Sequence, residues 1–177
     1  MTTEILIAGF GGQGVLSLGK IFAYAAVLEG REVSWLPSYG PEQRGGTCNV
    51  TVVVSDERIS SPIVDSFDIV ITLNQQSLSK FEPKVKPNGI LIYDTYGIVT
   101  PPQRTDINIY TMKAAEKARA EGIDKMLNMV VAGAVLSISP LVEKASMEAA
   151  LQKVLPERYH SLIAENCRAL ELGVGCV

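Results

Sequence analysis

The sequence predicts an α/β fold, a three-layer α/β/α sandwich around a Rossmann-like and largely parallel sheet. Short aliphatic runs alternate with segments of helical spacing along the chain, which is the pattern of βαβ units. Several of these runs are continuously apolar, as in strands that helices cover on both faces. The length of 177 residues suits one domain, spanning 1–177, with a core of its own.

Six runs rich in aliphatic and β-branched residues are predicted strands. The run 49–54 differs from the others, because Ser55-Asp56-Glu57 has the composition of a turn and Arg58-Ile59 would then begin a short return strand. A hairpin inserted into the parallel scheme would make the sheet mixed. The predicted strands are Ile5–Ala8, Val33–Leu36, Asn49–Val54, Ile69–Thr72, Ile90–Tyr93 and Ile107–Tyr110.

Six segments have the apolar spacing of helices. Gly30 is placed to end the first of them, Pro156 separates the last two, and Gly173 is expected to close the last. The apolar helix around Met129–Leu136 is predicted to be closely packed, with Ala132, Gly133 and Ala134 letting another element approach. An internal helix over the sheet is favoured over a contact with another subunit. The predicted helices are Val15–Leu28, Gln75–Lys80, Lys113–Ala120, Lys125–Ser137, Met147–Leu155 and Glu157–Leu172.

Composition restricts the possible functions. The formal net charge of −3 argues against a broad nucleic-acid-binding surface. Apolar residues make up 47% of the chain, which indicates apolar surface buried against a partner. The first apolar run is a buried strand rather than a signal peptide, and the stretch Met126–Val142 is too short and interrupted for a membrane span. We expect a cytoplasmic protein.

Neither a metal site nor a catalytic residue is predicted. Cys48, Cys167 and Cys176 are too scattered for a zinc or iron–sulfur site. Cys48 lies in a strand-like run and is expected to be a small buried residue. His160, the only histidine, is expected to be a surface or partly packed residue. Asp94 closes a predicted strand, where a turn or helix cap is favoured over a ligand contact.

A glycine cluster follows the first predicted strand directly. Gly9, Gly11 and Gly14 have the G-x-G-x-x-G register, with Gly12 and Gln13 between them, and helical spacing begins at Val15. Glycines allow a ligand close to the backbone, and free N–H groups at a helix start favour an anion. The acid that would hold a ribose is missing, because Glu32 opens the second strand instead of closing it. The motif therefore predicts a phosphate-bearing cofactor, with ordinary NAD binding disfavoured.

A second loop, Pro37–Thr47, follows the second predicted strand. Its prolines stiffen it, its glycines permit close approach, and Arg44 offers a fork of donors to phosphate or carboxylate. One interpretation is a rigid loop facing the same mouth as Gly9–Gly14. The other, equally favoured, is a surface connection whose Arg44 pairs with Glu42 or Asp94.

Together the two loops resemble the gamma subunit of the 2-oxoacid:ferredoxin oxidoreductases, which convert a 2-oxoacid and coenzyme A to acyl-CoA. The resemblance covers most of the chain up to about Leu141, and the C-terminal helices carry no matching motif. The Ser-Tyr-Gly-Pro-Glu-x-Arg-Gly-Gly pattern looks like the 2-oxoglutarate enzymes and the similar branched-chain ones, and less like the pyruvate type. Gln43 stands at the open position, where relatives often carry Met. The matching segments are Gly9–Gly14, Pro37–Thr47, Val54–Glu57, Ser61-Pro62, Gly89–Asp94 and Asn128–Ala134.

The resemblance implies a subunit of a larger complex that helps to bind coenzyme A. Thiamine diphosphate, magnesium and iron–sulfur clusters are expected on the alpha, beta and ferredoxin-like delta subunits, which pass electrons to ferredoxin. Two alternatives remain, a stand-alone nucleotide-dependent dehydrogenase and a purely architectural subunit. The residues expected to contact the cofactor are Gly9, Gly11, Gly12, Gln13, Gly14, Ser38, Tyr39, Arg44, Gly45 and Gly46.

Overall fold

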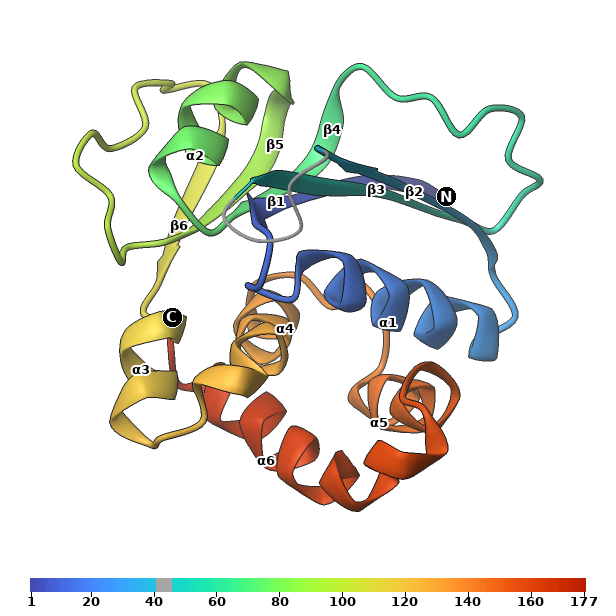
Figure 1. The fold of residues 1–177 in the computed structure, drawn as a ribbon. Coiled ribbons are helices and arrows are strands. Elements are labelled where there is room, and N and C mark those ends of the chain that lie inside the picture. Colours follow the sequence, from blue (N-terminus) through green and yellow to red (C-terminus); the bar gives the residue numbers. More distant parts are fainter. Residues whose placement is uncertain (41–45) are drawn as a thin grey trace.

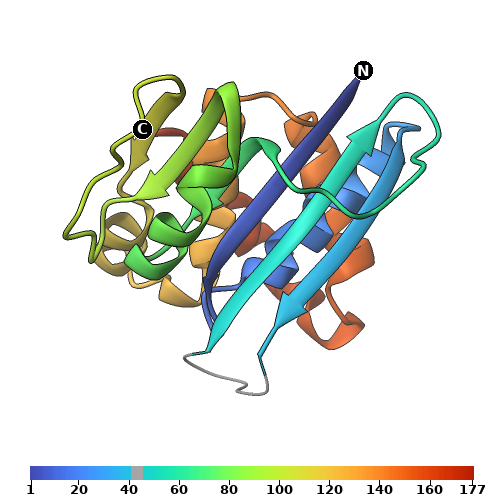
Figure 2. The same ribbon diagram turned by 90° about the horizontal axis from the view of Figure 1, so that it is seen from above.

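A computed structural model of the protein describes residues 1–40 and 46–177. Its six strands form one sheet in the order β2-β3-β1-β4-β5-β6 (Figure 2). Each predicted strand is found, and most are longer than the apolar run that predicted them. The strands are β1 (Thr2–Phe10), β2 (Glu32–Tyr39), β3 (Thr47–Ser55), β4 (Phe67–Thr72), β5 (Val85–Asp94) and β6 (Asn108–Met112).

The predicted mixed sheet is confirmed, but its hairpin lies elsewhere. β1, β4, β5 and β6 are parallel neighbours, and β3 is antiparallel to both β1 and β2. The hairpin is β2–β3, and the expected return strand after Ser55 was wrong. β1 and β2 already occupy both edges of β3, so the chain must leave the sheet there. Asp56 instead accepts a hydrogen bond from the Met1 amino group at 2.7 Å and lies 3.3 Å from Arg31.

β2 continues through Pro37 to Tyr39, three residues beyond the expected end. Gly40 N donates to Thr47 O at 3.4 Å, so these two residues form a hydrogen-bonded pair of the ladder. Along an antiparallel ladder, hydrogen-bonded residue pairs alternate with pairs that are not hydrogen-bonded. Pro37, which lies opposite Val50, belongs to a pair of the second kind, so its nitrogen faces the outer side of β2. Proline lacks a donor, and the strand edge is the place where that loss disrupts no ladder bond.

The helices cover the two faces of the sheet unequally. α1 and α4 pack on one face, with α5 and α6 outside them, while α2 lies on the other face (Figure 1). The 3₁₀ turns are η1 (Glu82–Lys84), η2 (Asp124–Met126) and η3 (Glu157–Leu162). The α-helices are α1 (Val15–Leu28), α2 (Gln75–Phe81), α3 (Ala114–Ala120), α4 (Leu127–Ile138), α5 (Lys144–Val154) and α6 (Ile163–Val174).

The end of α1 follows its predicted signal and α2 begins at an asparagine cap, whereas two predicted helix starts differ from the structure. Gly30 has a φ of 76° just after α1, and Asn74 Oδ1 accepts from Ser77 N at 2.8 Å at the start of α2. The expected helices from Lys125 and Glu157 instead begin with the 3₁₀ turns η2 and η3. Among the described residues, no helix has the length and apolar character needed to cross a membrane.

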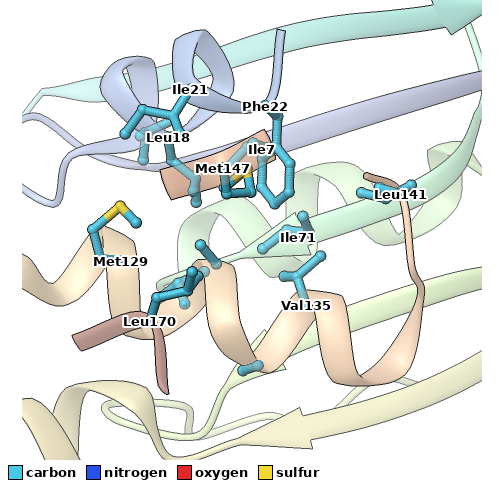
Figure 3. Packing of buried hydrophobic residues seen from close by; sticks show 14 of the residues in the cluster. Ile7, Leu18, Ile21, Phe22, Ile71, Met129, Val135, Leu141, Met147 and Leu170 are labelled. Atoms are coloured by element: carbon cyan, nitrogen blue, oxygen red, sulfur yellow. The ribbon is translucent and has the colours of Figure 1, made fainter. Parts of the chain in front are cut away.

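The main core fills the space between the sheet, α1, α4, α5 and α6. Ile7 and Ile71 project from the sheet toward Phe22 of α1, Val135 of α4 and Met147 of α5 (Figure 3). A smaller core lies under α2 on the opposite face. Its buried members are Leu6, Ala8, Phe67, Val70, Leu78, Phe81, Val85, Leu91 and Tyr93.

α4 and α6 cross at two glycines. A Cβ on Gly133 would collide with Leu170 O and lie 3.0 Å from Gly173 Cα. A Cβ on Gly173 would collide with Val130 O in the same way. The prediction that α4 is internal is confirmed. The prediction that Gly173 ends the last helix was wrong, because this glycine serves the crossing and α6 continues to Val174.

Gly133→Ala should destabilise the fold by about 1–3 kcal/mol, because the added methyl group has no room at the crossing. This cost should exceed the roughly 1 kcal/mol that alanine gains over glycine in a helix interior. Urea unfolding measures the difference. Gly175→Ala is the matched control, since its Cβ would lie 3.7 Å from Leu172 O. Equal stabilities of the two variants would contradict the close crossing.

Candidate functional site

The glycine turn between β1 and α1 requires particular backbone conformations. Gly12 has a φ of 103° and Gly14 a φ of 75°, both in the region that favours glycine. Gly9 is needed for a different reason, because a Cβ there would lie 2.6 Å from Gln13 Oε1 and 2.9 Å from Val15 Cγ2. Gly9 therefore serves packing, whereas a Cβ on Gly12 would meet nothing within 4 Å.

The side chain of Gln13 points into the protein and fixes the turn. Its Oε1 accepts a hydrogen bond from Phe10 N at 2.6 Å, and its Nε2 donates to Leu73 O at 3.1 Å. Leu73 N in turn donates to Ala8 O at 3.0 Å. One amide thus joins the ends of β1 and β4 to the turn. This geometry makes Gln13 a positioning residue, and its predicted contact with a cofactor stays a prediction.

Not every N–H group of the turn is free for a ligand. Gly11 N donates to Gly46 O at 3.0 Å, and Gln13 N donates to Phe10 O at 3.1 Å. The N–H groups of Gly12 and Gly14 have no backbone acceptor among the described residues. The first turn of α1 adds N–H groups that have no partner within the helix, although that of Leu16 is bonded to the Cys48 thiol. These donors, with the positive end of the helix dipole, form the anion-binding part of the turn.

The described ends of the second loop, at Tyr39-Gly40 and Gly46-Thr47, border one mouth together with the glycine turn. The hydrogen bond from Gly11 to Gly46 joins them directly. A cavity of about 660 Å³ lies between them. Its lining residues are Phe10, Gly11, Gly12, Gly14, Val15, Leu16, Ser17, Tyr39, Gly40, Gly46, Thr47 and Cys48.

The mouth contains some of the predicted site residues and not others. Gly11, Gly12, Gly14, Tyr39 and Gly46 line it. Arg44 and Gly45 lie outside the described residues.

Ser38 lies away from the mouth. It pairs with Asn49 in the β2–β3 ladder, and Asn49 lines a cavity on the α2 side of the sheet. Successive side chains of a strand point to opposite faces, so Tyr39 points to the mouth and Ser38 does not. The Ser38 side chain therefore lies on the other face of the sheet from Tyr39, and its contact with a cofactor stays a prediction.

Two further sequence interpretations concern residues near this edge of the sheet. Cys48 is buried, as predicted. Burial raises the pKa of its thiol, and a hydrogen bond from Leu16 N–H offsets this rise only in part. The Asp94 carboxylate accepts from Tyr96 N at 2.8 Å and from Ala115 N at 2.7 Å. The favoured turn and helix-cap role is thus confirmed, with burial raising the pKa of Asp94. Residues 1–40 and 46–177 contain no cluster of potential metal ligands.

Sequence reasoning missed two residues at the turn. Ser17 is exposed in the first turn of α1, and Asn128 begins the matching segment 128–134. A Cβ on Gly14 would lie 2.8 Å from Asn128 Cβ, so the start of α4 abuts the start of α1. Asn128 belongs to a segment that matches the family, whereas the only indication for Ser17 in the sequence was its position three residues after Gly14.

A second cavity, of about 810 Å³, opens from the same turn on its other side. It lies among α1, the start of α4, and the C-terminal segments α5, η3 and α6. Gly12, Gly14 and Ser17 line both cavities. The positive end of α1 is therefore accessible from two directions.

With this geometry in view, comparison with known proteins gives the family. The model of the family described as pyruvate ferredoxin/flavodoxin oxidoreductase matches residues 4–176. The chain belongs to this family. The resemblance seen in the two loops is thereby confirmed.

Relatives and solved structures agree with this assignment. The 2-oxoglutarate synthase subunit KorC of Methanocaldococcus jannaschii is 35% identical over 89% of this chain and 86% of its own length. A keto/oxoacid ferredoxin oxidoreductase gamma subunit from Geobacter sulfurreducens has a TM-score of 0.79 at 28% identity, covering 97% of this chain and 95% of that one. The 2-oxoglutarate:ferredoxin oxidoreductase of Magnetococcus marinus shares the fold, with a TM-score of 0.87 at 24% identity, over 98% of this chain and 30% of that one.

Some relatives are much longer than this chain. The ketoisovalerate oxidoreductase subunit VorA of Methanothermobacter thermautotrophicus is 39% identical over 96% of this chain, which covers 35% of that relative. The chain thus spans about a third of the length of the first curated relatives that it matches.

Gln13→Ala should lower the free energy of unfolding by about 1–3 kcal/mol, because Phe10 N and Leu73 O would both lose their partner. Urea unfolding of the variant measures this cost. Gln152→Ala, at an exposed position of α5, is the control and should change the stability by less than about 0.5 kcal/mol. A loss no larger than that of the control would mean that the amide does not hold the turn.

Proposed function

We propose that this chain is the gamma subunit of a multisubunit 2-oxoacid:ferredoxin oxidoreductase and that its mouth binds the phosphates of coenzyme A. The observation that carries the proposal is the hydrogen bond from Gly11 N to Gly46 O, which sets the described end of the second loop beside the glycine turn at the start of α1. Family membership over 4–176 agrees with it. Among the described residues, the end of β2 at Tyr39-Gly40 carries no acid that could hold a ribose, which fits coenzyme A better than NAD.

The chain's own part in the reaction is to bind and orient. The N–H groups of Gly12, Gly14 and the first turn of α1 would hold the anionic phosphates, and the Gln13 amide keeps those donors in place. Oxidation of a 2-oxoacid needs thiamine diphosphate and iron–sulfur clusters, which the proposed alpha, beta and delta subunits would supply. Electrons would leave through ferredoxin.

The 2-oxoacid is proposed to be 2-oxoglutarate, as the Ser-Tyr-Gly-Pro-Glu-Gln-Arg-Gly-Gly loop indicates. Relatives named 2-oxoglutarate synthase subunit KorC support this choice. The VorA relatives, named for ketoisovalerate, support a branched-chain 2-oxoacid as the second candidate. The decarboxylation pocket is expected on partner chains, which would then decide between the two.

Ser17→Asp should weaken coenzyme A binding to the assembled complex by about tenfold without unfolding the protein. A carboxylate in the first turn of a helix is favourable to the helix, typically by 0.3–1 kcal/mol, but it repels a phosphate held at the same place. Calorimetric titration of the complex with coenzyme A measures the affinity. Ser17→Asn is the matched control because it adds similar bulk without charge. Unchanged affinity in Ser17→Asp would favour the purely architectural alternative.

The isolated chain should not oxidise any 2-oxoacid, because no described residue replaces the thiamine carbanion or a cluster relay. The complex with its partner subunits should reduce ferredoxin with 2-oxoglutarate and coenzyme A. The control reaction replaces 2-oxoglutarate by 3-methyl-2-oxobutanoate. Faster turnover of that branched-chain acid would select the second candidate, and turnover by the isolated chain would overturn the subunit assignment.

A further inference from the structure

Two consecutive residues at the end of β4 contact the side chain of Gln13. Leu73 O accepts a hydrogen bond from Gln13 Nε2 at 3.1 Å, and Asn74 Nδ2 donates to Gln13 Oε1 at 3.5 Å, a long hydrogen bond. The third contact is local, because Phe10 lies three residues before Gln13. Leu73 and Asn74 therefore hold the Gln13 amide against β4, one at each end of the amide.

The contact with Asn74 favours one of the two orientations that the Gln13 amide can adopt. An amide oxygen accepts two hydrogen bonds, and Gln13 Oε1 is approached by the donors Phe10 N and Asn74 Nδ2. The space around this oxygen is narrow, because a Cβ on Gly9 would lie 2.6 Å from it. If the amide were turned over, its NH₂ group would face two donors. Asn74 thus supports the orientation in which Phe10 N and Leu73 O are both bonded.

The orientation of Asn74 is fixed in turn by the start of α2. Its Oδ1 caps this helix by accepting from Ser77 N at 2.8 Å. Turning the Asn74 amide over would set its NH₂ against the Ser77 N–H and its oxygen against Gln13 Oε1, and both contacts would be repulsive. Asn74 is buried, so either unpaired group would be costly. The cap therefore directs the Nδ2 donor toward Gln13.

The first turn of α2 is a firm reference for this contact. Gln75 Oε1 accepts from both Val99 N and Thr100 N at 2.8 Å, which ties the first residue of the helix to the loop after β5. Leu78 N donates to Asn74 O at 3.0 Å. The backbone of Asn74 is thus held from the face of the sheet that α2 covers (Figure 1).

We infer that Asn74 is a positioning residue for the glycine turn and that it acts through the amide of Gln13 rather than on a ligand. It connects α2, on one face of the sheet, to the N–H donors at the start of α1, on the other (Figure 1). Where it concerns affinity for coenzyme A, the inference rests on the proposed function.

Asn74→Ser separates the two contacts of this residue. Serine caps a helix about as well as asparagine, but its shorter side chain does not extend to Gln13 Oε1. Amide hydrogen exchange, measured by NMR on the full chain, should become about tenfold faster at Phe10, whose acceptor is loosened, and stay unchanged at Ser77, whose cap is kept. Gln76→Ser, at an exposed position of α2, is the control and should alter neither amide.

A purely structural cap would give a different pattern of exchange. Phe10 exchange that stays at the wild-type rate, or that rises together with exchange at Ser77, would overturn the inference. Asn74→Asp is the second variant, because it keeps the capping oxygen and replaces the donor by an acceptor. It should accelerate Phe10 exchange at least as much as Asn74→Ser does. Thermal unfolding shows that each variant is folded.

Affinity for coenzyme A in the assembled complex tests the consequence. Asn74→Ser should weaken binding by about fivefold to tenfold, and Gln76→Ser should not. In a Gln13→Ala background the same serine should add no further loss, because the amide through which it acts is gone. Losses that add in the double variant would overturn the inference.

The two readouts separate this inference from the proposed function. Wild-type Phe10 exchange in Asn74→Ser, with a Ser17→Asp complex that binds coenzyme A poorly, would overturn the inference alone. A wild-type complex that does not bind coenzyme A would overturn the proposed function, and the exchange rates of Phe10 and Ser77 would still decide the role of Asn74 in the turn.

Discussion

The amide of Gln13 is the contact on which the site geometry depends. By accepting from Phe10 N and donating to Leu73 O, it holds the ends of two parallel strands and the turn between β1 and α1 in one arrangement. That arrangement fixes the direction of α1, and the direction of α1 decides where its unpaired N–H groups point. The same turn then brings Gly14 against Asn128, which sets the start of α4 beside the start of α1.

Much of the fold could be predicted because local patterns and tertiary packing agree. Continuous aliphatic runs became the parallel strands, and Gly30 ended α1 as its position indicated. The errors arose where packing outweighs a local signal. Gly173 looks like a helix stop, but the crossing with Gly133 needs it inside α6. Ser55-Asp56-Glu57 looks like a hairpin turn, but both edges of β3 are already paired.

The site was predictable to the extent that it consists of contiguous motifs. The two loops could be recognised, and their joint mouth followed from the positions of β1 and β2. Successive residues of a strand point to opposite faces of the sheet, so the side chains of Ser38 and Tyr39 lie on different faces. A sequence motif does not show which face each side chain takes unless the pairing with β3 is known. The larger cavity had no sequence signal, because Ser17, Asn128 and Asn166 are far apart in the chain and meet only through the packing of α4 and α6 against α1.

The hydrogen bond from Gly11 N to Gly46 O has a consequence for how such a site can diverge. It joins main-chain atoms, so its formation does not depend on which side chains surround it. The spacing of the two loops can therefore persist while neighbouring positions accumulate substitutions. A mouth framed by backbone in this way is robust to mutation and still evolvable, since side chains around it can adjust affinity without rebuilding the frame.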